Sequence, residues 1–151
     1  MKKENCVFCN YSGNKTIRES ENTITILSNP YLLKGHCLVI PKRHYESLIE
    51  TPDNILFEIM KEIKNIEMLL LGKLGAEGID IRQNYRPFLK ENRYKIDHLH
   101  FHIIPRTLED ELYKKSMIYE KDVFKDLNEG LLNELKNSLT SSERHRYQQT
   151  Q

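Results

Sequence analysis

The spacing of apolar residues along this chain alternates between a period of two and a period of three or four. Short apolar or β-branched runs bounded by turn residues predict three strands, at residues 23–27, 37–40 and 78–83. Residues 98–104 alternate histidine with apolar residues, which is typical of a half-buried strand. This alternation places the three imidazoles on one face of the strand and the intervening apolar side chains on the other.

Two helices are expected between and after these strands. Isoleucine and leucine recur every three or four residues from 55 to 70, which predicts a long helix with one buried face. Thr51 is the expected N-cap of this helix, with Pro52 at its first position. A second helix is expected at residues 119–138, where several leucines fall on one side.

The order of these elements predicts the fold. Two strands precede the long helix and two follow it, which favours an α+β fold: an antiparallel sheet with a long helix packed on one face and a C-terminal helix. The chain of 151 residues is long enough for one domain, which is expected at residues 1–137. The polar segment 138–151 is expected to be a flexible tail.

Composition narrows the class of protein. The net charge of +1 gives no electrostatic reason to expect nucleic-acid or membrane binding. No apolar run approaches the roughly 20 residues that a membrane helix needs. The basic first residues are followed by no apolar stretch, so no secretory signal is expected. Three cysteines fit a reducing compartment better than a disulfide scaffold, which makes the cytoplasm the expected location.

The three histidines of residues 98–104 are the main candidates for chemistry. Histidine titrates near neutral pH, binds metals and can act as a nucleophile. Side chains at positions i and i+2 of a strand lie about 6.6 Å apart, whereas zinc–nitrogen bonds are about 2.0–2.1 Å long. This geometry counts against a catalytic metal held by all three. It favours a division in which His98 binds a metal while His100 and His102 serve another purpose.

Cys6 and Cys9 have the two-residue separation common in zinc sites. The sequence has no second pair of this kind, so two further ligands would have to come from distant histidines, with His44 and His98 as candidates. The alternative is a pair of reduced surface cysteines beside a solvated His44.

These segments together resemble the histidine-triad (HIT) superfamily. Residues 98–104 match its signature His-Φ-His-Φ-His-Φ-Φ at every position, where Φ is an apolar residue. Residues 34–44 resemble its Gly-His-x-Leu-Val-Ile-Pro-Lys-x-His segment, and the Cys-x-Phe-Cys at residues 6–9 recurs in its zinc-containing bacterial branch. The resemblance covers residues 6 to about 106.

The resemblance implies a nucleotide hydrolase or transferase that acts at an α-phosphate. In this family His100 would be the nucleophile that forms a nucleotidyl-histidine intermediate, and His102 and His36 would assist around the phosphate. The implied substrate is a nucleotide, with a purine nucleoside phosphate expected. Dinucleoside polyphosphate hydrolysis is the leading possibility. The alternatives are phosphoramidate hydrolysis and a non-catalytic nucleotide-binding module.

The resemblance also implies a structural zinc ion and a homodimer. Cys6, Cys9, His44 and His98 match the zinc ligands of the bacterial branch. Relatives commonly pair through the long helix and a sheet edge, so a homodimer is expected, although the same apolar positions would also serve as core.

Contacts with the nucleotide are expected from three further polar residues. Ser28 and Asn29 fall near the position where relatives contact the ribose hydroxyls, and Asn84 falls near a phosphate-contacting amide. Turn formation before Pro30 explains Ser28 and Asn29 equally well.

The loop at residues 85–97 departs from the family pattern. Many relatives carry a Gly-Gln-Ser/Thr stretch there, whereas this loop has no glycine or serine and is longer. Its basic residues suit a more anionic leaving group such as a polyphosphate. These residues are Arg86, Lys90, Arg93 and Lys95. A solvated basic loop is the alternative.

Overall fold

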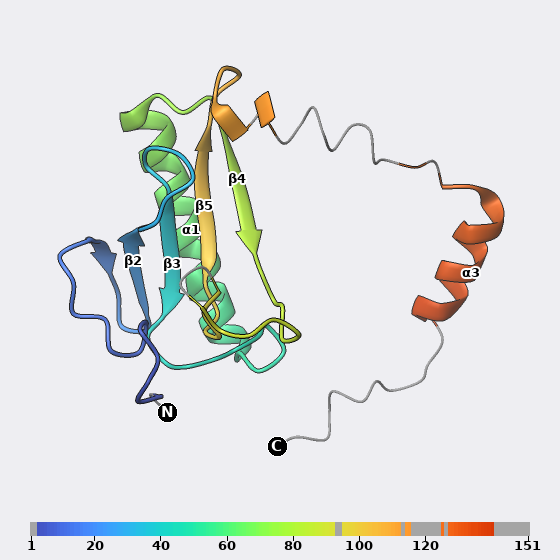
Figure 1. The fold of residues 1–151 in the computed structure, drawn as a ribbon, viewed down its shortest axis with the longest axis horizontal. Coiled ribbons are helices and arrows are strands. Elements are labelled where there is room, and N and C mark those ends of the chain that lie inside the picture. The colour runs from blue at the N-terminus through green and yellow to red at the C-terminus, as the bar shows by residue number, and fades with distance from the viewer. Residues whose placement is uncertain (1–2, 93–94, 113, 116–124, 126, 141–151) are drawn as a thin grey trace.

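Five antiparallel strands form one sheet in the order β1-β2-β3-β5-β4 (Figure 1). The computed structural model describes residues 3–92, 95–112, 114–115, 125 and 127–140. The strands are β1 (Thr16–Glu19), β2 (Thr23–Leu27), β3 (Cys37–Pro41), β4 (Gly78–Gln83) and β5 (Phe101–Arg106). The predicted α+β architecture is therefore confirmed, and β2 and β4 have the bounds expected from the sequence.

Helix α1 (Asp53–Leu74) covers one face of this sheet. Its isoleucines at the helical spacing are buried against apolar side chains of β3 and β5. The main core cluster includes Val39, Ile59, Ile63, Ile66, Leu99, Phe101 and Ile103. Because α1 occupies one face, the polar side chains that alternate with these strand residues are directed to the opposite face, which positions the site.

The histidine segment is only partly a strand. Strand β5 begins at Phe101 rather than at the expected residue 98 and continues to Arg106. Before it, the Leu99 N–H donates to the Tyr45 carbonyl at 2.6 Å, so this stretch is held by the loop after β3 and not by the sheet ladder. The expected alternation still holds, since Leu99 and Phe101 join the core while His102 lies on the other face.

Two local expectations were wrong. Strand β1 was not predicted because all of its side chains are exposed, and an element without a buried face has no hydrophobic alternation to detect. Thr51 does not cap α1: its hydroxyl donates to the Ser47 carbonyl at 2.8 Å and so belongs to the preceding turn. Pro52 occupies the capping position without a side-chain hydrogen bond.

The second helix, α3 (Glu129–Thr140), begins later than expected. Residues 127 and 128 lie outside the helix, and residues 119–124 and 126 lie outside the described part of the chain. The tail expected at 138–151 likewise falls mostly outside it, since the description ends at residue 140. Among the described residues, no helix has the length and apolar character needed to cross a membrane.

Candidate active site and metal centre

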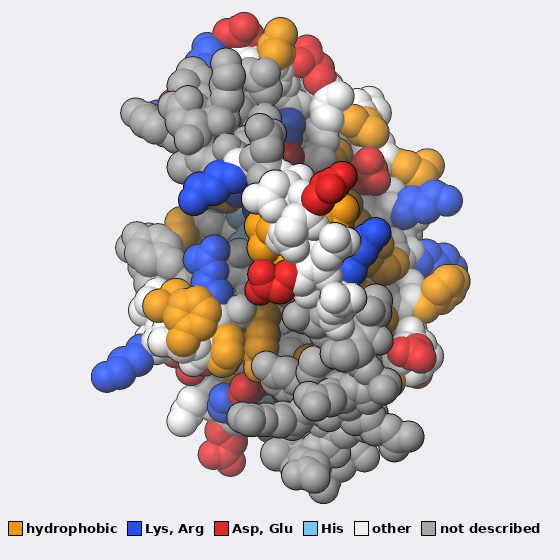
Figure 2. All heavy atoms as spheres, turned by 90° about the vertical axis from the view of Figure 1, so that its right-hand side faces the viewer, with side chains coloured by type: hydrophobic (Ala, Val, Ile, Leu, Met, Phe, Trp, Pro, Cys, Tyr) orange, Lys and Arg blue, Asp and Glu red, His pale blue; other side chains and the backbone are white. Residues whose placement is uncertain are grey.

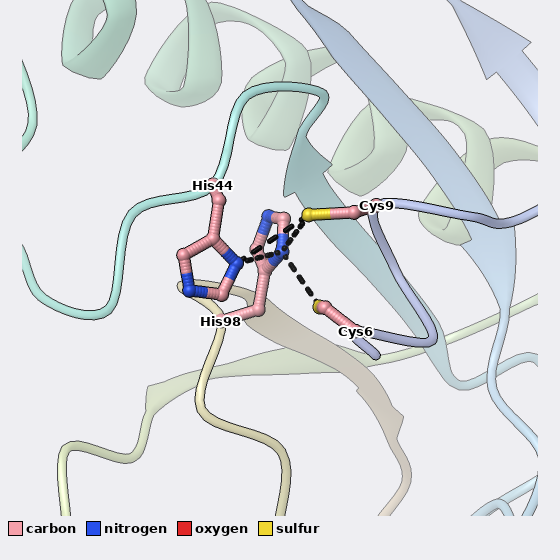
Figure 3. A group of neighbouring side chains, drawn as sticks. All are labelled: Cys6, Cys9, His44 and His98. Atoms are coloured by element: carbon pink, nitrogen blue, oxygen red, sulfur yellow. Dashed lines mark hydrogen bonds between the residues drawn. The ribbon is translucent and has the colours of Figure 1, made fainter. Parts of the chain in front are cut away.

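Two cysteines and two histidines from three separate segments meet at one point (Figure 3). Cys6 and Cys9 come from the N-terminal loop, His44 follows β3, and His98 precedes β5. The Nδ1 atom of His98 lies 3.3 Å from the Cys6 Sγ, 3.6 Å from the Cys9 Sγ and 3.2 Å from the Nδ1 of His44. All four donor atoms lie within 4.8 Å of one another. The cluster is thus compact enough for one ion to contact all four.

The far side of each imidazole in this cluster is held by an oxygen atom. His98 Nε2 lies 2.8 Å from the Pro41 carbonyl, and His44 Nε2 lies 3.4 Å from a Glu46 carboxylate oxygen. These partners accept the ring protons, so each Nδ1 lone pair faces the cysteines, as in metal sites whose histidines donate to an outer oxygen. Burial lowers the pKa of His98 to about 4, which favours the neutral form that a metal ligand requires.

The donor set fits a tetrahedral metal ion. Burial raises the pKa of the Cys6 thiol, so a thiolate there requires a compensating cation. Two cysteines and two histidines around one point are a common ligand set of structural zinc sites. The four residues expected as ligands from the sequence are therefore brought together, and the cluster could hold a metal.

His100 is oriented by the same segment that carries His98. Its Nδ1–H donates to the His98 carbonyl oxygen at 2.6 Å. With the proton on Nδ1, the Nε2 lone pair is available for attack on an electrophile. The ring of Phe8 approaches that of His100 edge-on with centroids 5.2 Å apart, and burial lowers the pKa of His100. The arrangement yields a neutral, fixed imidazole.

His36 and His102 form a hydrogen-bonded pair with defined tautomers. The Leu32 main-chain N–H donates to His36 Nδ1 at 3.1 Å, so the proton of His36 is on Nε2. That Nε2–H donates to His102 Nδ1 at 3.0 Å, which leaves the proton of His102 on its own Nε2. The hydrogen bonds therefore form a chain with one donor direction, from the main chain of the β2–β3 connection through His36 to His102 on β5.

Both of these imidazoles are neutral at pH 7. Burial, with the nearby Arg82 and His100, lowers the pKa of His36 to about 4. Burial lowers the pKa of His102 to about 3, with smaller contributions from His100, His36 and Arg82. The three histidines can therefore accept or share protons at neutral pH without adding repulsive charge.

A cleft of about 660 Å³ opens beside these histidines. Apolar and aromatic side chains make most of its wall: Val7, Phe8, Tyr11, Ile26, Leu27, Tyr31, Leu32, Leu38 and Ile96. His36, His100 and His102 also line it, and Lys15 adds a positive charge. Its volume and character suit a small ligand with an apolar body and an anionic group.

Of the three residues expected to contact nucleotide, the structure places two at the cleft and one away from it. Ser28 and Asn29 line the cleft, but the Ser28 hydroxyl donates to the Pro30 carbonyl at 2.6 Å, as turn formation requires. Asn84 is exposed after β4, does not line the described cleft, and accepts a long hydrogen bond from Arg86. Its role stays a prediction without support from its position.

Sequence reasoning missed two cationic residues, one that lines the cleft and one that lies beside its histidines. Lys15 precedes the unpredicted strand β1 and lines the cleft. Arg82 lies directly opposite His102 in the β4–β5 pairing. Neither stands in a recognisable motif, and a pairing register that could have indicated Arg82 is not visible in a single sequence.

The fold and site together define a class: a small α+β protein with a histidine-lined cleft next to a Cys₂His₂ cluster. A family profile, the HIT domain, matches residues 12–109. The chain belongs to the HIT family, as its histidine motif indicated.

Several relatives have known sequences or structures. An uncharacterized HIT-like protein of Methanocaldococcus jannaschii is 36% identical over 105 residues, which cover 67% of this chain and 78% of the relative. The adenylylsulfatase HINT3 of Arabidopsis thaliana is 30% identical over 72% of this chain and 55% of its own length. The adenosine 5′-monophosphoramidase HNT1 of Candida albicans is 28% identical over 67% of this chain and 70% of the relative.

Solved structures share the fold. A HIT family protein from Bacillus anthracis superposes with a TM-score of 0.73 at 21% identity, covering 93% of this chain and 99% of that one. A zinc-bound histidine triad protein from Mycobacterium smegmatis superposes with a TM-score of 0.63 at 26% identity, covering 89% of this chain and 97% of that one.

Proposed function

We propose that this protein hydrolyses a nucleotide, or transfers its nucleotidyl group, by attack of His100 on the α-phosphorus. The observation that carries the proposal is the hydrogen bond from His100 Nδ1–H to the His98 carbonyl, because it leaves Nε2 as a fixed nucleophile. Relatives named as a phosphoramidase and an adenylylsulfatase support a hydrolase that acts on an adenylyl compound.

The reaction would take two displacements. The Nε2 lone pair of His100 forms a bond to the α-phosphorus as the bond from phosphorus to the leaving group breaks, and the electron pair departs with that group. Water then bonds to the phosphorus, and the electrons of the N–P bond return to Nε2. One proton of the water stays on the phosphate and the other passes to solvent, releasing a nucleoside monophosphate.

The other histidines would stabilise the phosphate between these steps. His102 has its Nε2–H available as a donor, because Nδ1 accepts from His36. A donor aimed at a phosphate oxygen stabilises the charge that develops in the transition state. The apolar wall of the cleft would take a purine base, and Ser28 and Asn29 would lie beside the ribose.

We also propose that the Cys6, Cys9, His44 and His98 cluster holds a structural zinc ion. The donor set fits zinc, and all four positions are taken by side chains, which leaves no open position for a substrate. The zinc-bound relative from Mycobacterium smegmatis supports this choice of metal. The three described cysteines are free thiols, which a reducing compartment preserves, so we propose the cytoplasm as the location.

A homodimer is proposed from the outer side of α1. Four large apolar side chains of this helix are exposed: Phe57, Met60, Met68 and Leu71. A patch of this kind on a small protein is often covered by a partner. Light scattering on the purified protein would give twice the chain mass of 18.0 kDa. A single-chain mass at micromolar concentration would contradict the dimer.

Replacement of His100 tests the catalytic proposal. Wild-type protein mixed with an adenylyl substrate and quenched without acid should carry an adenylate adduct detectable by intact mass spectrometry. His100→Ala should form no adduct and release no adenosine monophosphate, because the nucleophile is gone. Adenosine monophosphate binding should persist in this variant as evidence of folding. Turnover by His100→Ala within tenfold of the wild type would contradict the proposal.

A further inference from the structure

Arg82 places a positive charge beside the histidines from a strand that does not line the cleft. In the β4–β5 pairing Arg82 lies directly opposite His102, and in the β3–β5 pairing Leu38 lies opposite the same residue. Side chains of directly opposed residues share a face of the sheet. The row across this face therefore runs from apolar Leu38 through His102 to cationic Arg82.

A network of charges holds Arg82 in this place. Its Nη2 donates to Asp80 Oδ2 at 2.7 Å, and Arg106 donates to the same carboxylate oxygen. Arg106 is itself fixed by Asp110, through its Nε at 2.8 Å and its Nη2 at 3.2 Å. Asp80 thus accepts hydrogen bonds from two arginines. Of these, Arg106 is also paired with a second carboxylate, that of Asp110.

Arg82 retains donors for a ligand. Guanidinium has five N–H donors, and within the described part of the chain the side chain of Arg82 makes a single hydrogen bond. Its side chain is 41% exposed, so an incoming anion can reach it. Figure 2, which faces the β4 side of the molecule, shows Lys and Arg side chains interspersed with acidic and apolar ones, and a few histidine atoms between them.

The position of Arg82 indicates which part of a substrate it would meet. Strands β2 and β3, which carry Ile26, Leu27 and Leu38 of the apolar wall that suits a base, lie on one side of β5 in the sheet. Arg82 lies on the opposite side, on β4. A phosphorus held at His100 and His102 would therefore carry its nucleoside toward β2 and its leaving group toward β4.

The chemistry of the leaving group decides whether a cation helps. A sulfate or a phosphate chain departs as an anion when its bond to the α-phosphorus breaks, and a guanidinium stabilises that charge. An amine departs from a phosphoramidate only when it takes up a proton, and a neighbouring cation gives no such help. A fixed arginine at this position thus separates the two substrate classes.

We propose that Arg82 is a specificity-determining residue that binds an anionic leaving group, and that the substrates are nucleotides with a sulfate or phosphate chain on the α-phosphate. This inference rests on the proposed action of His100. It also assigns the binding of the leaving group to strand β4 instead of to the basic loop at 85–97, where the sequence suggested it. In the described part of that loop, Lys95 is paired with Asp97, and Arg86 is directed to Asn84.

Two arginine variants and two kinds of substrate test the inference. We would compare Arg82→Gln, Arg82→Lys and the control Arg86→Gln with adenosine 5′-phosphosulfate, diadenosine tetraphosphate and adenosine 5′-phosphoramidate. Arg82→Gln should lose about 10- to 100-fold in kcat/KM on both anionic-leaving-group substrates, the range for a hydrogen bond to a charged group. It should change less than about threefold on the phosphoramidate, while Arg82→Lys recovers part of the loss.

The outcomes separate this inference from the proposed function. Equal losses of Arg82→Gln on all three substrates, or no loss on any, would overturn the role of Arg82. A selective loss in Arg86→Gln instead would return the role to the loop. If the wild type releases no adenosine monophosphate and forms no adduct with any substrate, the proposed function itself has failed. The substrate on which Arg82→Gln loses more kcat/KM indicates whether the residue binds a sulfate or a phosphate chain.

Discussion

At the scale of single residues, His98 connects the two parts of the site. Its ring belongs to the Cys₂His₂ cluster, while its main-chain carbonyl accepts a hydrogen bond from His100 Nδ1–H at 2.6 Å. Phe8, between the two cysteines, packs edge-on against the rings of both histidines. The Cys₂His₂ cluster and His100 are therefore joined through one peptide unit and one aromatic ring.

The buried histidines also determine how stability depends on pH. The pKa of His36 falls to about 4 and that of His102 to about 3, mainly through burial, from the ordinary 6.5. Between about pH 6.5 and 4 the unfolded chain therefore binds more protons than the folded one. The free energy of unfolding must then fall as the pH is lowered through this window.

Replacing His102 should weaken that dependence. In His102→Asn the amide oxygen still accepts from His36 Nε2–H, so the fold should persist while one titrating group is lost. Between pH 7 and pH 5 the wild type should lose about 1–2 kcal/mol more unfolding free energy than this variant. Urea unfolding at the two pH values measures the difference. Identical pH dependence in both proteins would show that His102 is not held neutral by the fold.

At the scale of elements, the turn before β3 depends on a glycine. Gly35 has φ +92°, a region that other residues enter only with strain, and it directly precedes His36. A Cβ there would also lie 2.8 Å from the Leu74 Cδ1 of α1. In contrast, a Cβ on Gly72, inside α1, would meet nothing within 4 Å. The two glycines therefore form a matched pair for substitution.

We expect alanine to have opposite effects at these positions. Gly35→Ala should lower the free energy of unfolding by about 1–3 kcal/mol because of backbone strain. Gly72→Ala should raise it by about 0.5–1 kcal/mol because glycine is unfavourable in a helix interior. Chemical denaturation of both variants beside the wild type provides the measurement. Equal effects of the two substitutions would show that the backbone conformation at Gly35 does not require glycine.

Elements with a buried face could be predicted from the sequence, and contacts between elements could not. The isoleucine repeat of α1 and the run of β2 are patterns that burial imposes on a single segment. The exposed β1 carries no such pattern. Arg82 lies opposite His102 because of a pairing register across a loop of unusual length, and that register is set only when the sheet forms.

At the scale of the whole molecule, the N-terminal loop is attached by the Cys₂His₂ cluster and by two aromatic side chains. The Asn10 side-chain amide donates to the carbonyls of Lys3, Glu4 and Cys6, all within the same loop. Contacts with the rest of the protein include the two cysteines, the packing of Phe8 and Tyr11 against β2 and β3, and the exposed pair of Lys3 and Glu46. Yet this loop supplies one wall of the cleft.

Removal of the metal should therefore affect both stability and ligand binding. Cys6→Ser, or a strong chelator, should lower the melting temperature and weaken adenosine monophosphate binding by about tenfold, within the range of coupling between linked sites. Calorimetric titration with and without chelator measures this, and Cys37→Ser, at a buried cysteine outside the cluster, is the control. Unchanged affinity after verified metal loss would show that the cleft wall does not need the ion.

The single loop that bears both Cys6-x-x-Cys9 and Phe8 has a reciprocal consequence. If the ion increases the affinity for a nucleotide, thermodynamic linkage requires that the nucleotide increase the affinity for the ion by the same factor. A protein saturated with nucleotide would then need a higher concentration of a competing chelator to lose its zinc than the nucleotide-free protein does. Where zinc is scarce, the supply of substrate would help to decide how much of this protein keeps its metal.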